Sequence, residues 1–179
     1  MQKLNNYVNG EWVASKSPRS MEVEDPGTGE MLAQIQMTTR EEVDVAVKSA
    51  MEASEVWREV PVTERTGYLF KLKMLLEEHF EELATLTTKE HGKTLDEAKG
   101  DTRRLIENVD ASLGIPSLMQ GNIQWRIARE IDEYFVRESL GVFAGIAPFN
   151  FPGMIPFWYL PYAIALGNSF IVKPSEQTP

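Results

Sequence analysis

The sequence predicts an α/β fold in which short strands at both ends of the chain flank a block of helices. Three features lead to this prediction. Residues 4–36 alternate short apolar runs with turn dipeptides, residues 39–114 carry apolar side chains at helical spacing, and residues 141–173 place two strand-like runs around a proline-rich helical stretch. The length of 179 residues fits one domain or slightly more.

Composition excludes several classes of protein. Hydrophobic residues make up 42% and charged residues 25%, as in average globular domains, which excludes disorder for most of the chain. The net charge of −9 argues against binding to nucleic acid or to anionic membranes. The absence of cysteine excludes a thiolate metal site or a thiol nucleophile within these residues. No metal site is expected, because His79 and His91 lie among glutamates, typical of a solvated helix face.

Turn and capping signals mark the first elements. Asn9-Gly10 separates two strand-like runs and predicts a hairpin. A second turn at residues 26–29 precedes a strand over residues 31–36. Thr39 and Glu42 fit the capping box of a first helix.

Leucines at three- and four-residue steps predict a second helix over residues 63–91, with Gly92 as its left-handed C-cap. Gly92-Lys93-Thr94 is similar to the end of a phosphate loop, but Thr87 stands where that loop needs glycine. A third helix is expected over residues 95–113. The period then changes to about two over residues 124–136, which predicts a pair of strands at an oligomer edge.

No charged residue occurs over residues 139–172, yet four prolines interrupt this stretch, which argues against a membrane helix. We expect instead a buried strand over residues 141–147, a buried helix over 152–166 and a strand over 169–173. A ligand of such a βαβ unit binds at the carboxyl ends of the strands, here residues 148–150 and 173–176. Because the N-terminus resembles neither a signal nor a transit peptide, the expected location is cytoplasmic.

The segments GVFAGIAPFNFP and GNSFIVKPSEQTP resemble the aldehyde dehydrogenase superfamily. YVNGEW, EHGKTLDEAKGD and RESLGVFAGIAP occur in the family's order, so the resemblance covers essentially the whole chain. APFNFP and IENVDASLGIPSLMQG are most similar to the CoA-acylating methylmalonate-semialdehyde (malonate-semialdehyde) dehydrogenase group. The resemblance implies the N-terminal part of that fold. Residues 1–120 and 140–179 would belong to an incomplete Rossmann-like NAD domain, and residues 121–139 would be bridging strands for homo-oligomer assembly.

The resemblance also implies roles for individual residues. Asn150 would donate a hydrogen bond to the oxyanion that forms from the aldehyde. Arg104 would hold the carboxylate of a semialdehyde substrate. The residues that would contact NAD are Ala147, Phe149, Lys173, Glu176 and Gln177, although the subgroup usually has arginine in place of Gln177.

Each of these residues has a plainer interpretation. Asn150 fits a turn or helix cap, and Lys173 with Glu176 fits a solvated surface pair. Ala147 and Phe149 are also ordinary core residues, and Arg103 beside Arg104 suggests a solvated helix face.

Family members attack the aldehyde with a cysteine thiolate, pass hydride to NAD and release the thioester to CoA or water. In the family the cysteine and the general-base glutamate lie beyond the position that matches Pro179. The resemblance therefore implies the N-terminal part of an NAD-dependent, CoA-acylating dehydrogenase of methylmalonate or malonate semialdehyde, inactive by itself. Two alternatives stay open: a truncated relative that acts only in dinucleotide binding or assembly, and a dehydrogenase for another aldehyde, such as succinate semialdehyde.

Overall fold

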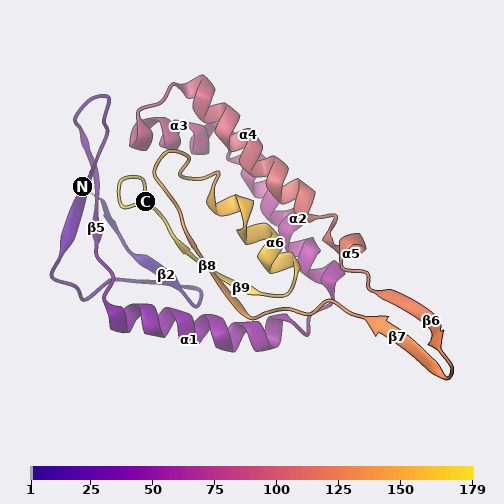
Figure 1. Ribbon diagram of the computed structural model, residues 1–179. Helices are drawn as coiled ribbons and strands as arrows, with labels where there is room; N and C mark the ends of the chain where they lie inside the picture. The colour runs from indigo at the N-terminus through magenta and orange to yellow at the C-terminus, as the bar shows by residue number, and fades with distance from the viewer. Residues whose placement is uncertain (1) are drawn as a thin grey trace.

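The computed structural model describes residues 2–179 and shows a block of helices beside several small sheets, with one hairpin extending away from the body (Figure 1). A mixed sheet near the N-terminus has the strand order β1-β5-β4, formed by β1 (Gln2–Leu4), β4 (Ser20–Glu24) and β5 (Met31–Gln36). Strand β1 is parallel to β5, and β4 is antiparallel to it.

The hairpin predicted at Asn9-Gly10 is confirmed. It joins β2 (Asn6–Val8) to β3 (Glu11–Val13), which pair antiparallel. Asn9 and Gly10 have φ angles of 51° and 80°, and positive φ at both positions is what a type I′ turn requires.

The capping box predicted for the first helix, α1 (Arg40–Trp57), is also confirmed. Glu42 accepts hydrogen bonds from the main-chain N–H groups of Thr39 and Lys16 and from the Ser15 hydroxyl. These bonds lower the pKa of Glu42 to about 2, so its carboxylate is ionised at neutral pH. Glu42 therefore links the start of α1 to the segment that follows β3.

The single helix predicted over residues 63–91 is wrong, because the chain bends at His79. The two pieces are α2 (Val62–Glu78) and α3 (Phe80–His91), and the backbone of His79 is not helical, with φ −96° and ψ 18°. Both pieces pack against α4 (Leu95–Ser112). Because both helices turn apolar side chains toward α4, the spacing of apolar residues continues through the bend, and the sequence gives no sign of it. The predicted left-handed C-cap at Gly92 is present, with φ 80°.

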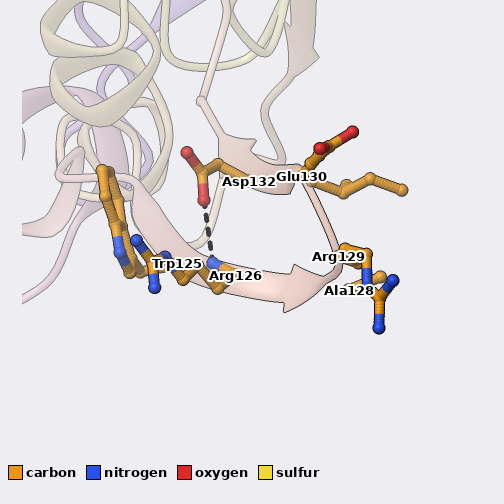
Figure 2. Close-up of a pocket in the computed structure, with 7 residues that line it drawn as sticks. Trp125, Arg126, Ala128, Arg129, Glu130 and Asp132 are labelled. Atoms are coloured by element: carbon orange, nitrogen blue, oxygen red, sulfur yellow. Dashed lines mark hydrogen bonds between the residues drawn. The ribbon is translucent and has the colours of Figure 1, made fainter.

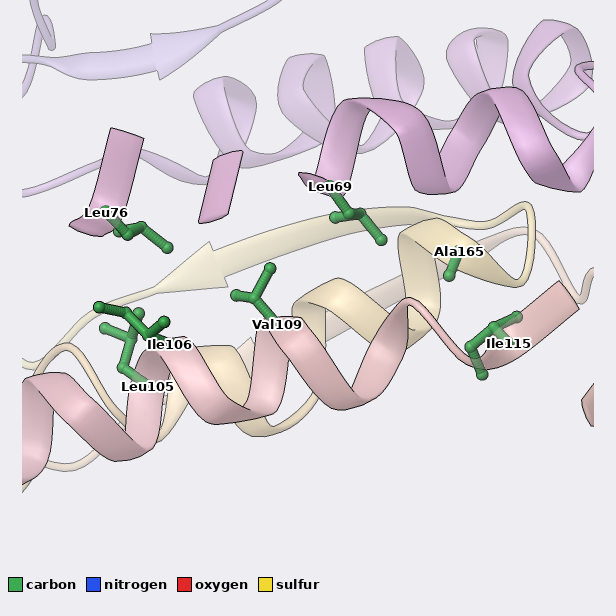
Figure 3. Close-up of a cluster of buried hydrophobic side chains, with 7 residues drawn as sticks. All are labelled: Leu69, Leu76, Leu105, Ile106, Val109, Ile115 and Ala165. Atoms are coloured by element: carbon green, nitrogen blue, oxygen red, sulfur yellow. The ribbon is translucent and has the colours of Figure 1, made fainter. Parts of the chain in front are cut away.

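The main hydrophobic core lies between α2, α4 and α6 (Leu160–Ala165), with α5 (Ile115–Leu118) at one end (Figure 3). Its buried side chains are Leu69, Leu76, Leu105, Ile106, Val109, Ile115 and Ala165. Burying such side chains contributes about 1.5–3 kcal/mol each, so this cluster holds the helical block together.

The predicted strand pair after the helices is confirmed as β6 (Asn122–Ala128) and β7 (Ile131–Phe135), an antiparallel hairpin. Every residue of both strands is exposed, and the hairpin extends away from the body (Figure 1). Near its tip the main-chain N–H of Arg126 donates to Asp132 at 2.8 Å, beside a concave surface that Trp125 also lines (Figure 2).

The C-terminal βαβ unit is present, but two predicted details are wrong. The expected helix over residues 152–166 consists of turns, a 3₁₀ turn η1 (Pro156–Trp158) and the short α6, since prolines lack the N–H that a continuous helix needs. The strands β8 (Val142–Ile146) and β9 (Ser169–Lys173) are parallel. Strand β8 is not buried: Ile146 is 79% exposed, because within residues 2–179 these two strands form a two-stranded sheet. Among the same residues, no helix is long and apolar enough to cross a bilayer.

Candidate functional site

The parallel pairing of β8 and β9 brings the two predicted site segments together. Ile146 pairs with Lys173 at the last register position, and the N–H of Ala147 donates to the carbonyl of Lys173 at 2.9 Å. The chain then leaves β8 into the loop that carries Phe149 and Asn150, and leaves β9 into the turn that carries Glu176. The residues expected to bind one ligand therefore emerge at the same edge of the sheet.

Lys173 and Glu176 form an ion pair at this edge. The distance from Lys173 Nζ to Glu176 Oε2 is 2.8 Å, and both side chains are partly exposed. The hydrogen bond from Lys173 lowers the pKa of Glu176, so the carboxylate is ionised at neutral pH and can accept hydrogen bonds. Gln177 is exposed in the same turn, and its main-chain N–H donates to Ser175 Oγ at 3.2 Å.

Asn150 caps neither helix that follows it. The residues at the N-terminal ends of η1 and α6 are Ile155 and Tyr159, and Asn150 lies in a bend before both. Its side chain is exposed, whereas its main-chain carbonyl accepts a hydrogen bond from Lys93 Nζ at 3.0 Å. The backbone of Asn150 is thus held by Lys93, while the residue itself is exposed to solvent.

The residues on either side of Pro148 have different environments. Ala147 is buried, whereas Phe149 is half exposed and stacks on the ring of His91, with 6.4 Å between ring centroids and 29° between planes. The solvated-face prediction is correct for His79, which is exposed and lies 2.8 Å from Glu82 Oε2. It is wrong for His91, because α3 ends against the loop after β8. Among residues 2–179 the buried Nδ1 of His91 has no hydrogen-bond partner, and burial lowers its pKa.

The two neighbouring arginines of α4 have different surroundings. Arg103 faces α2 and α3: its Nη1 donates to both carboxylate oxygens of Glu77, at 2.9 and 3.0 Å, and its guanidinium lies over the Phe80 ring. Arg104 is exposed one residue further on.

The side of α4 that carries Arg104 faces the segment after β8. Asp101, one turn before Arg104, pairs with the Lys93 that contacts Asn150, and Asn108, one turn after it, accepts a hydrogen bond from the Tyr162 hydroxyl at 3.4 Å. Arg103 thus forms a surface pair with Glu77, whereas Arg104 is exposed on the side of the helix nearer the loop. The choice between a solvated helix face and a substrate-binding role for Arg104 stays open.

Sequence analysis missed the residues that hold the loop, namely His91, Lys93 and Asp101. In the sequence, the Gly92-Lys93-Thr94 segment indicates a C-cap, a failed phosphate loop and part of a family motif, but no contact with the loop after β8. Its actual contacts are with residues 149–151, which follow much later in the chain, and no local pattern reports such a contact.

The parallel βαβ unit, with polar side chains at the carboxyl ends of its strands, defines a Rossmann-like α/β protein. Residues 12–179 match the aldehyde dehydrogenase family, and the chain therefore belongs to this family.

The similar proteins include the malonate-semialdehyde dehydrogenase of Listeria innocua, which is 50% identical over the whole chain. The chain spans only 37% of the length of that relative. An enzyme from Sinorhizobium meliloti, assigned as a methylmalonate-semialdehyde dehydrogenase and solved with NAD, superposes with a TM-score of 0.97 at 39% identity. The methylmalonate-semialdehyde dehydrogenase of Oceanimonas doudoroffii gives 0.96 at 38% identity. In both cases all of this chain and 36% of the solved chain are covered.

Proposed function

We propose that these residues form the N-terminal part of an NAD-dependent, CoA-acylating malonate- or methylmalonate-semialdehyde dehydrogenase. The observation that carries the proposal is that Asn150, Lys173 and Glu176 emerge at one sheet edge. The identity of about half of all positions to a malonate-semialdehyde dehydrogenase supports this substrate class. The nucleophilic thiol has to come from outside these residues, which contain no cysteine.

Each site residue has a chemical task in this proposal. The Asn150 amide donates to the carbonyl oxygen as it gains negative charge, and an amide does so without titrating. The ionised Glu176 accepts hydrogen bonds from the ribose hydroxyls of NAD, and Lys173 keeps it charged and oriented. Arg104 binds the substrate carboxylate through its two parallel N–H groups. NAD supplies the hydride acceptor, and CoA receives the acyl group.

The proposal is tested on the native gene product, purified from its own cells. We expect an intact mass more than double the 20.3 kDa of these residues, and CoA-dependent NADH formation from malonate or methylmalonate semialdehyde. A product of 20.3 kDa that binds NAD but forms no NADH would favour the truncated relative. Faster turnover of succinate semialdehyde or an unbranched aldehyde would favour a dehydrogenase for another substrate.

Arg104→Ala is expected to lower kcat/KM for malonate semialdehyde by about 10- to 100-fold, because a hydrogen-bonded charge pair with the substrate is lost. Activity on an unbranched aldehyde without a carboxylate should change little. The matched control is Arg103→Ala, which removes a surface pair with Glu77 and should leave both substrates unaffected. Equal kinetics in the two variants would refute the role of Arg104.

Glu176→Gln is expected to raise the Kd for NAD by about 10- to 100-fold, since a charged acceptor for the ribose hydroxyls is lost. The pKa of Glu176 is lowered in the folded protein, so the NAD affinity should persist as the pH falls to its ordinary value of 4.5 and decline only below it. Lys173→Met removes the largest cause of the lowered pKa of Glu176, so the decline in NAD affinity should begin at higher pH. Titration calorimetry at a series of pH values measures the Kd for NAD of each variant. Coincident pH profiles for wild type and Lys173→Met would contradict the effect of Lys173 on Glu176.

We also propose that the β6–β7 hairpin assembles with a second copy of the whole protein. Its large apolar side chains are exposed, among them Ile123, Trp125 and Tyr134, and exposed apolar patches mark interaction surfaces. Trp125→Glu should shift the sedimentation coefficient toward the monomer. Gln124→Glu adds the same charge at a polar neighbour and should not. An unchanged assembly in Trp125→Glu would place the interface elsewhere.

A further inference from the structure

The segment that joins α3 to α4 contacts three successive residues of the loop after β8. The ring of His91 stacks on Phe149, and Lys93 Nζ donates to the main-chain carbonyl of Asn150 at 3.0 Å. The same ammonium group lies 4.6 Å from the centroid of the Phe151 ring. The exposed residue Asn150 is thus held through its own backbone and through both neighbours.

Lys93 is a largely buried cation, and its partner is a largely buried carboxylate. Its Nζ lies 2.5 Å from Asp101 Oδ2, and the two side chains are only 9% and 16% exposed. A buried pair is held in one geometry, because a charge that loses its partner away from water costs several kcal/mol. The Lys73–Asp110 pair has the same distance but exposures of 27% and 55%, which makes it a suitable comparison.

The backbone around Lys93 is fixed on both sides. Gly92 has a φ of +80°, and a Cβ there would lie 2.8 Å from Pro26 Cγ. On the other side, Thr94 and Glu97 form the capping box of α4. The Lys93 side chain therefore starts from a defined position and has a defined direction toward the loop.

We propose that Lys93, together with Asp101, is a positioning residue that aims the Asn150 amide at the reacting carbonyl oxygen. This inference rests on the function proposed above. An oxyanion donor acts only within a narrow range of distance, and a misplacement of about 1 Å can cost about 100-fold in rate. A bond to the main-chain carbonyl of Asn150 restrains its peptide plane and leaves the side-chain amide free for the substrate.

The test uses the whole enzyme with Lys93→Met, Lys93→Arg and the control Lys73→Met. Lys93→Met should lower kcat by about 10- to 100-fold while the Kd for NAD changes by less than about twofold. Lys93→Arg should recover part of the loss, because a guanidinium can donate to the same carbonyl. Lys73→Met should match the wild type. In an Asn150→Ala background, Lys93→Met should lower kcat by less than about twofold further, because the group it positions is absent.

Equal losses in the two backgrounds would show that Lys93 only supports the fold, and an unchanged kcat in Lys93→Met would show that it does not position Asn150. If Lys93→Met fails to fold, Asp101→Asn and Lys93→Arg provide the same comparison in both backgrounds. Failure of the proposed function has a different signature: wild type and Lys73→Met then form no NADH from any semialdehyde. Hydrogen exchange of residues 149–151 still decides the positioning in that case, because Lys93→Met should speed it and Lys73→Met should not.

Discussion

Asn150→Ala is expected to lower kcat of the whole enzyme by about 100- to 1,000-fold, equivalent to about 3–4 kcal/mol of lost transition-state stabilisation. The amide is exposed at the sheet edge and caps neither following helix, so its removal should cost little stability. The Kd for NAD should change by less than about twofold, because an oxyanion donor acts on the aldehyde rather than on the cofactor. Steady-state kinetics, the thermal midpoint and an NAD titration of the same preparation measure the kcat, the stability and the Kd.

Asn150→Asp is the matched control that keeps the size and shape of the side chain. It keeps the volume of the side chain but replaces a donor with a negatively charged acceptor, which repels the developing oxyanion. Its kcat should therefore fall at least as far as that of Asn150→Ala. A kcat within about threefold of wild type in either variant would assign the oxyanion donor to another group.

Features that depend on neighbouring residues could be predicted from the sequence. The capping box at Thr39, the Asn9-Gly10 turn and the C-cap at Gly92 all form as expected, because each is decided within a few residues. The shared sheet edge of residues 148–150 and 173–176 could also be predicted, since parallel strands joined by a crossover end at the same edge whatever the connecting segment does. That a ligand binds there stays a prediction.

Features that depend on tertiary packing could not be predicted. The bend at His79 is invisible because α2 and α3 turn the same apolar period toward one core. His91 is flanked by polar residues in the sequence, yet it meets Phe149 across the fold. Arg65 donates to the carbonyl of Ala165, and Lys93 donates to the carbonyl of Asn150. Both acceptors lie far away in the sequence, so no local pattern reports these contacts.

Arg65 gives the largest expected effect on stability. It is 4% exposed, and its guanidinium donates to three main-chain carbonyls: Ala165 at 2.9 Å, Val60 at 2.5 Å and Arg58 at 3.3 Å. It therefore joins the end of α6, which leads into β9, to the turn between α1 and α2.

Arg65→Met keeps much of the side-chain volume but leaves these carbonyls without their donor, so we expect a loss of about 2–4 kcal/mol in the free energy of unfolding. Urea titration of the purified protein measures it, with Arg103→Met as the control. That variant loses an exposed pair with Glu77 and should cost less than about 1 kcal/mol. Equal midpoints for the two variants would mean that water replaces the guanidinium at these carbonyls. Strand β9 would then be held by its pairing with β8 and its packing on α1 and α6.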